Sequence, residues 1–232
     1  MKLIRFAFLI CACGASANLF ADDWQTALAK MPLATSTTEL NRDNCVPLLL
    51  NSFQSNGVVK ALIFMPGATD EIYFFRRAHA QLANANASLA DAIVALTNQT
   101  YIQADFRPPL LILHTTEDSL DVIADEKNKS TAEKLRQRTV SEKISLNDAD
   151  WDGVHEAVGK FLSVGLRPRE GSPDSWHFYR HSFVANGVTQ WELLETLALA
   201  GKTTFSVHWL TVDFEPDRRE GQPPKLEKFP AR

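Results

Sequence analysis

Residues 88–96 read SLADAIVAL and residues 189–197 read TQWELLETL, and the two stretches align at an offset of 101 residues. Each opens on a hydroxyl residue, Ser88 or Thr189, that can cap a helix, and each carries an acid three positions later. Apolar side chains then recur at helical spacing. The pattern predicts one capped amphipathic helix in each half of the chain.

The segments around these two helices also correspond. An Ala-Asn pair precedes each helix, and two strand candidates follow it. Working outward, each half predicts the order strand, helix, strand, strand, helix, strand, strand. Any two amphipathic helices match at caps and faces, so the alternative is that the halves are unrelated. The sequence predicts an α+β fold of two tandem small αβ domains, residues 22–126 and 127–216, with a disordered tail at 217–232.

The individual elements follow from apolar periodicity and turn residues. Helices are expected at 22–31, from a cap at Asn41 or Asp43 through Phe53, at 88–96, at 131–138, from a cap at Asn147, Asp148 or Asp150 through Leu162, and from Thr189 to the stop at Gly201. Strands are expected at 35–40, 58–65, 101–106, 110–113, 140–146, 166–169, 176–183, 205–209 and 210–214, while 71–77 is ambiguous.

Composition excludes several classes of protein. The chain has 232 residues, of which 45% are hydrophobic and 22% charged, as in soluble globular proteins. These values argue against a disordered chain, a collagen-like chain and a polytopic membrane protein. The formal net charge is −4, so no basic field favours nucleic acid as a partner.

The N-terminus has the features of a secretory signal. Two cations precede a short apolar run and then small residues, which predicts a signal peptide at residues 1–21. Cleavage is expected after Ala17 or Ala21, and the acidic residues after Ala21 favour that site. A membrane-anchored N-terminus is the alternative, but the apolar run is far shorter than a membrane span. We therefore expect a periplasmic or extracellular protein without a membrane span after cleavage.

Cleavage would leave Cys45 as the only cysteine, and hence no internal disulfide. Cys45 lies in the apolar stretch CVPLLL, which predicts a buried, inert side chain. A nucleophilic role would require a neighbouring base, and no histidine lies within thirty residues of Cys45.

The second half resembles a known family. Residues 186–207, NGVTQWELLETLALAGKTTFSV, comprise a capped helix, a glycine turn and an alternating strand. This arrangement resembles the secretin and TonB short N-terminal (STN) domain over residues 140–216, with a fainter echo in 35–114. The resemblance implies a small αβ module that binds a protein partner in the cell envelope and needs no cofactor. The chain departs from the family pattern because no secretin or TonB-dependent barrel follows.

A partner-binding surface is expected at an exposed sheet edge or in the groove beside the helix from Thr189. Aromatic side chains could contribute a platform there, namely Trp176, Phe178, Tyr179 and Trp191. The alternative for these aromatic residues is packing in the core of a small sheet.

Residues 107–120 offer an alternative, enzymatic interpretation. The buried strand ending at His114, followed by Asp118, looks like the acid-bearing strand of α/β-hydrolases, but no Gly-x-Ser-x-Gly nucleophile motif occurs in the chain. The same region could bind a metal through His114, Glu117, Asp118 and Asp121, or could be a solvated acidic turn. We expect a non-enzymatic envelope module, with a hydrolase-like or metal-dependent enzyme as the alternative.

Overall fold

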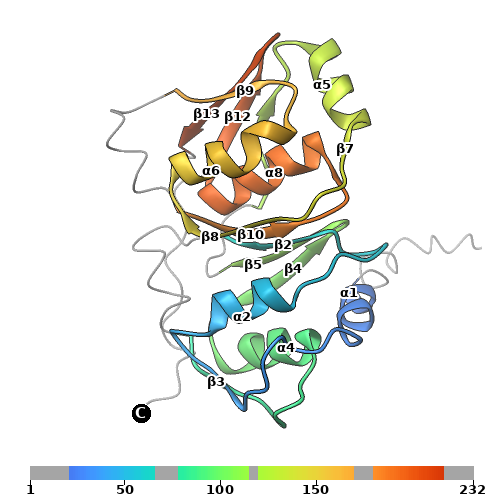
Figure 1. Cartoon of the computed structure of the whole chain (residues 1–232), viewed down its shortest axis with the longest axis vertical. Helices are drawn as coiled ribbons and strands as arrows, with labels where there is room; N and C mark the ends of the chain where they lie inside the picture. Colours follow the sequence, from blue (N-terminus) through green and yellow to red (C-terminus); the bar gives the residue numbers. More distant parts are fainter. Residues whose placement is uncertain (1–20, 66–77, 115–119, 170–179, 217–232) are drawn as a thin grey trace, which may run out of the picture.

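The computed structural model describes residues 21–65, 78–114, 120–169 and 180–216, in a layered α+β fold of the predicted class (Figure 1). The helices are α1 (Ala21–Leu28), α2 (Cys45–Ser52), α4 (Leu89–Gln99), α5 (Lys129–Gln137), α6 (Trp151–Val158), its 3₁₀ extension (Gly159–Phe161) and α8 (Gln190–Gly201). No helix within these ranges has the length and apolar character needed to cross a membrane.

Short strands make up the rest of the framework. They are β1 (Glu39–Leu40), β2 (Ala61–Phe64), β3 (Ala80–Gln81), β4 (Gln103–Arg107), β5 (Leu110–His114), β6 (Ala124–Asp125), β7 (Thr139–Val140), β8 (Ile144–Ala149), β9 (Gly165–Pro168), β10 (His181–Ala185), β11 (Val188–Thr189), β12 (Thr203–Val207) and β13 (Thr211–Pro216). The predicted signal and tail, the ambiguous stretch at 71–77 and most of the predicted strand at 176–183 fall outside the described residues.

The strands form two main sheets and two short ribbons. The central sheet has the order β4-β5-β2-β10-β8, and the outer sheet has the order β6-β12-β13-β9. The ribbons pair β1 with β3 and β7 with β11. Strands from both predicted domain ranges therefore share the central sheet, where β2 pairs antiparallel with β10, although the sequence led us to expect separate sheets.

The pairing pattern is repeated within the chain. In residues 21–114, here called repeat 1, β5 lies between antiparallel β4 and parallel β2. In residues 120–216, repeat 2, β13 lies between antiparallel β12 and parallel β9. The registers match at the offset of 101, since Ala104 pairs with Leu113 and Phe205 pairs with Phe214. The ribbon β1–β3 corresponds likewise to the antiparallel pair β8–β10.

The two central helices start as the sequence predicts. Ser88 and Asp91 form a capping box at α4, in which each side chain bonds the other residue's backbone N–H. Thr189 and Glu192 form the same box at α8. Both boxes satisfy N–H groups that the first helical turn would otherwise leave without a partner.

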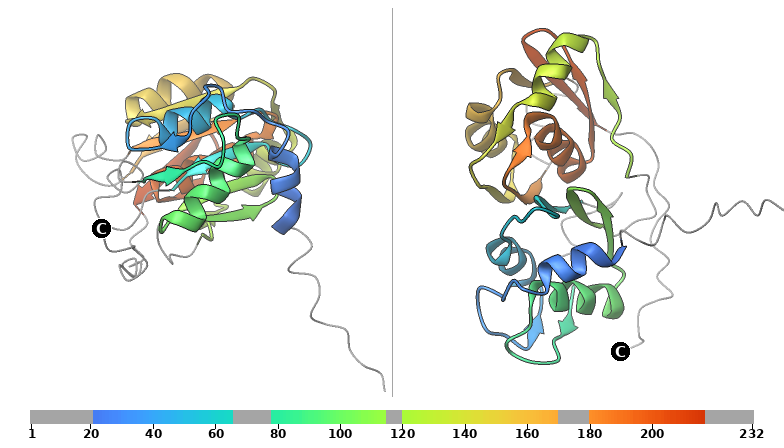
Figure 2. Two further views of the ribbon diagram at one scale, coloured as in Figure 1. Left: turned by 90° about the horizontal axis from the view of Figure 1, so that it is seen from below. Right: turned by 90° about the vertical axis from the view of Figure 1, so that its right-hand side faces the viewer.

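The central sheet is covered on both faces. Leu62 and Phe64 of β2 point into the core of repeat 1, and Ile63 points into the core of repeat 2. Figures 1 and 2 show α2 and α4 on one side of this sheet and α6 and α8 on the other. Helix α8 is consequently buried almost throughout, whereas α4 keeps an exposed face.

The outer sheet ends the stack. Its inner side chains, such as Phe205 and Phe214, are buried, but the opposite face is polar. The positions that correspond to Ile63 and Ile112 of the central sheet hold Arg167 and Asp213. A charged face cannot cover a further helix as the central sheet covers α8, so this stack ends with repeat 2.

Candidate functional site

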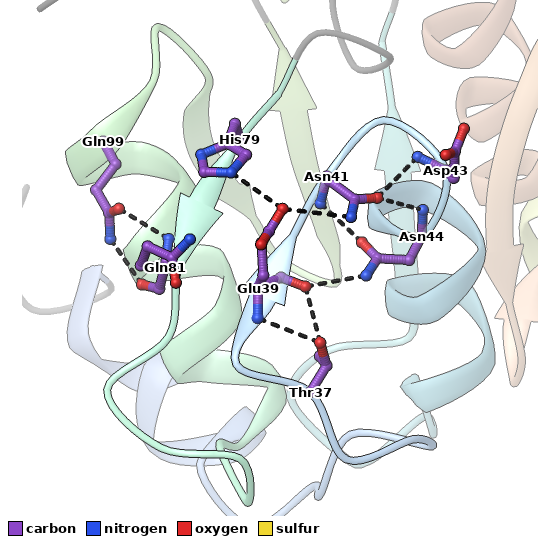
Figure 3. Close-up of polar contacts among 8 residues, drawn as sticks. All are labelled: Thr37, Glu39, Asn41, Asp43, Asn44, His79, Gln81 and Gln99. Carbon is purple, nitrogen blue, oxygen red and sulfur yellow. Dashed lines mark hydrogen bonds and ion pairs between the residues drawn. The ribbon is translucent and has the colours of Figure 1, made fainter.

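The repeat allows each sheet edge to be compared with its counterpart. An edge strand presents backbone N–H and C=O groups that can pair with another chain, and proteins usually block such edges. The outer edges of the β1–β3 ribbon are closed by side chains, as Figure 3 shows. Gln81 N–H donates to Gln99 Oε1 (2.9 Å), and Gln99 Nε2 donates to the Gln81 carbonyl (2.8 Å). One amide thus occupies the place of a neighbouring strand.

The equivalent position in repeat 2 explains this cap. Residue 200, at the offset of 101 from Gln99, is a buried alanine. There the edge of β10 is filled by β2 in place of a side chain. The glutamine therefore stands where repeat 1 has no neighbouring strand within the described residues.

The other edge of the ribbon is closed in a similar way. Thr37 Oγ1 accepts from Glu39 N–H (3.2 Å), and Asn44 Nδ2 donates to the Glu39 carbonyl (2.9 Å). The Glu39 carboxylate pairs with His79 at 3.0 Å (Figure 3). Both side chains of that pair are about half exposed, so this network closes an edge and does not enclose a ligand.

Two further edges are interrupted by the backbone. Beside β8, the register shifts between His181 and Phe183, and Asp148 has a left-handed φ of 55°. A bulge of this kind prevents regular pairing with an added strand. Strand β9 ends at Pro168, which has no N–H to offer.

Strand β4, at the end of the central sheet, differs from its counterpart in repeat 2. Its counterpart β12 has β6 beside it in parallel, with Phe205 opposite Ala124 and Ser206 opposite Asp125. Phe205 N–H donates to the Ile123 carbonyl at 3.0 Å. On the matching side of β4 no strand from the described ranges is paired. We define the β4 edge as this outer side of Gln103–Arg107.

Register fixes which backbone groups face that edge. Residues 107 and 110 flank the two-residue hairpin turn Pro108-Pro109 and form its closing pair. Because hydrogen bonding alternates along an antiparallel pair, Ala104 and Phe106 direct their backbone groups away from β5. Their side chains are half buried over the core of repeat 1, whereas Gln103, Asp105 and Arg107 are exposed.

The exposed face of β4 carries charges that are held in place. Asp105 Oδ2 lies 2.6 Å from Nε2 of the buried His114, and this hydrogen bond lowers the pKa of the Asp105 carboxyl. Arg107 Nη1 donates to the Leu120 carbonyl (2.8 Å) and to Asp121 Oδ1 (3.1 Å). Asp105 is therefore a fixed, half-exposed carboxylate beside the β4 edge.

The predicted enzymatic residues are only partly described. His114 faces Asp105, while Asp121 accepts a hydrogen bond from Arg107, so these two predicted metal ligands contact different partners. Glu117 and Asp118 lie outside the described residues. Across the described ranges, no group of three or more metal-ligating side chains is assembled. Sequence reasoning missed Asp105 because it is brought to His114 by the hairpin and not by a motif.

Cys45 has the predicted environment. The residue is fully buried, and burial raises the pKa of its thiol to about 12. A thiol that stays protonated is a poor nucleophile, so this residue serves packing.

The predicted aromatic platform differs from the structure at Trp191. This side chain is only 7% exposed, packs edge-on against Phe205 and lies under the Arg136 guanidinium, 3.9 Å from the ring centroid. Its indole N–H donates to Glu195 Oε1 at 2.8 Å. Because α8 is buried on both sides, Trp191 is a core residue and not a partner-facing one. Trp176, Phe178 and Tyr179 lie outside the described residues.

An exposed aromatic side chain that the sequence did not single out lies elsewhere. Trp209 is 76% exposed, next to the exposed Leu210 in the turn between β12 and β13. Alternation with Phe205 and Val207 predicted a strand position for it, and the turn that actually forms there exposes it.

No protein-family model matches this chain, and comparison with curated proteins and with solved structures gave no significant match.

Proposed function

We propose that this protein is an exported, non-enzymatic module of the cell envelope that binds a protein partner at the β4 edge. One observation carries the proposal: β12 has β6 as a parallel neighbour, and its counterpart β4 has none among the described strands. The same fold therefore accepts a strand at this position in repeat 2, whereas in repeat 1 no described strand occupies it.

The treatment of the other edges supports this choice. Side chains close both edges of the β1–β3 ribbon, a bulge interrupts β8 and a proline ends β9. The β4 edge has no such blocking feature and no paired strand among the described residues, which favours a role in binding over an unused edge. Strand addition supplies affinity through main-chain hydrogen bonds and specificity through alternate side chains.

Photo-crosslinking in the native host tests the partner. A photoreactive amino acid at the exposed Gln103 should yield a discrete adduct with another protein, and the same group at the exposed Glu156 of α6 should not. Ala104→Pro removes the N–H that faces the edge and should abolish the adduct, whereas Ala104→Ser should retain it. Equal adducts from both positions would argue against a specific edge.

The export part of the proposal rests on the signal-like sequence of residues 1–21 and on the resemblance of residues 140–216 to the STN domain. Mass spectrometry of the protein isolated from its host should give a mature chain beginning at Asp22, in the periplasm or the medium. Full-length protein confined to the cytoplasm would contradict export.

A second candidate function has one observation in its favour. The buried imidazole of His114 and the half-exposed carboxylate of Asp105 form a hydrogen-bonded pair, as general-base sites do. An enzyme centred on His114, Glu117 and Asp118 should turn over an ester or phosphate substrate, with or without a divalent metal. Loss of such turnover in both Asp118→Ala and His114→Ala would overturn the non-enzymatic proposal.

A further inference from the structure

We infer that the β4 edge takes an extended partner segment parallel to β4, with an apolar residue opposite Ala104 and a basic residue next to it, opposite Asp105. This inference rests on the proposed function and specifies the partner of the same edge. Its geometry comes from β6, which shows how a single extended segment pairs with the equivalent strand.

The direction of the added segment follows from the repeat. β6 runs parallel to β12, and Phe205 N–H donates to the residue preceding its partner Ala124. Transferred by 101 residues, Ala104 N–H would donate to the residue that precedes its own partner. The Ala104 carbonyl would then accept from the N–H of the residue that follows, as in any parallel ladder.

The residue opposite Ala104 should be apolar and larger than alanine. In repeat 2, the large Phe205 pairs with the small Ala124, and both pack on the core. In repeat 1 the strand residue is the small Ala104, which packs on the core beside Phe106. Because a cross-strand pair fills a shared volume, a small residue on β4 leaves room for valine, isoleucine or leucine on the partner.

The next residue should be basic because the charge pattern changes between repeats. Ser206 faces Asp125 of β6, whereas its counterpart in β4 is Asp105. The Asp105 carboxylate is held in position by His114 and remains half exposed. Directly opposed like charges destabilise a strand pair and opposite charges stabilise it. A segment like β6 itself, with an acid at this position, is therefore disfavoured.

A peptide series tests the side-chain part of the inference. The probe is acetyl-Thr-Thr-Val-Lys-Val-Thr-amide, and its comparator replaces lysine by glutamate. Fluorescence polarisation with the full-length protein should show about tenfold weaker binding of the glutamate peptide. Asp105→Asn should reduce that preference, and Asp43→Asn, an exposed acid remote from β4, should leave it unchanged. Equal binding of both peptides would overturn the charge assignment.

A backbone test keeps the inference falsifiable if a β4 variant fails to fold. N-methylation of the lysine peptide bond removes the N–H that would reach the Ala104 carbonyl, so affinity for the wild-type protein should fall at least about tenfold. Methylation of the second valine nitrogen, which faces away from β4 in this register, serves as the control. Equal loss or no loss with the two methylations would exclude strand addition in this register.

Orientation is read by paramagnetic labels on the two peptide ends. Parallel pairing predicts that an N-terminal label broadens the amide signal of Gln103 and that a C-terminal label broadens that of Arg107. The reverse pattern would overturn the parallel inference while leaving the proposed edge intact. Absence of any change over 103–107, together with no crosslink from Gln103, would remove the proposed function itself.

Discussion

The side-chain amide of Gln99 closes a two-hydrogen-bond ring with the backbone of Gln81, at 2.8 and 2.9 Å, as a neighbouring strand would. Gln99→Ala should lower the free energy of unfolding by about 0.5–1 kcal/mol, because two exposed hydrogen bonds are lost. It should also promote concentration-dependent self-association, since the edge of β3 becomes available. Urea denaturation and light scattering measure the two effects. Asn98→Ala, at the exposed neighbouring position of α4, is the control and should change neither.

The imidazole of His181 leaves no room for a side chain at Gly201. A methyl group on Gly201 would overlap Nε2 of His181, whose ring is fully buried and packs against Trp151 at a centroid distance of 5.9 Å. Gly201→Ala should therefore destabilise the fold by about 1–3 kcal/mol, as overpacked cores do. Gly57→Ala adds a methyl group with no atom within 4 Å and serves as the control. Equal thermal midpoints for the two variants would contradict this packing role.

The pKa of the Glu195 carboxyl is subject to opposing effects. Burial is the main cause that raises its pKa above the ordinary 4.5, while the hydrogen bond from Trp191 and the charge of Arg136 oppose it. A raised carboxyl pKa means that the folded state binds the proton more tightly than the unfolded chain, so this group destabilises the fold as pH rises. Glu195→Gln should therefore raise stability above neutral pH, an advantage that fades as pH falls towards about 3.

Denaturation curves of Glu195→Gln from pH 3 to pH 8 provide the measurement. Glutamine still accepts the indole N–H of Trp191, so the comparison isolates the charge. Glu156→Gln, an exposed acid on α6, is the matched control. A Glu195→Gln variant that is less stable than the wild type at pH 8 would show that attraction to Arg136 outweighs burial.

Asp105 should show the opposite pH dependence. The hydrogen bond from His114 lowers the pKa of its carboxyl below the ordinary 3.8. A lowered folded-state pKa contributes stability that is present above the unfolded value and is lost as pH falls through the folded value. Asp105→Asn should thus be less stable than the wild type at pH 7, and the difference should shrink below about pH 3. Asp43→Asn, an exposed acid, should show no such trend in parallel urea titrations.

The sequence predicted the parts of this fold that depend on local chemistry. The caps at Ser88 and Thr189 follow from hydroxyl and acid spacing, and both capping boxes are present. The β-branched and aliphatic run that contains Ala61–Phe64 likewise forms a buried strand. Such signals lie within one helical turn or one strand, so a single sequence contains them.

The sequence could not predict which strands pair with one another over long distances in the chain. Nothing within β2 or β10 specifies the other as a neighbour, because alternation fixes which face a side chain takes and not which strand lies alongside. The two-residue β6 is too short to leave a pattern. Asp105 escaped notice for a related reason: the acids after His114 drew attention, whereas the hairpin brings Asp105 across from the preceding strand.

Helix α8 belongs to the core of repeat 2, where its buried side chains pack in one cluster with Ile63 and Ile112 of the repeat 1 strands. If either repeat unfolded, the other would lose the helix or the sheet face against which its own side chains pack. We therefore expect the two repeats to unfold in a single cooperative transition, so that a substitution in either one lowers a common melting temperature. The duplicated topology describes how the chain is arranged, whereas the shared core predicts that it unfolds as one unit.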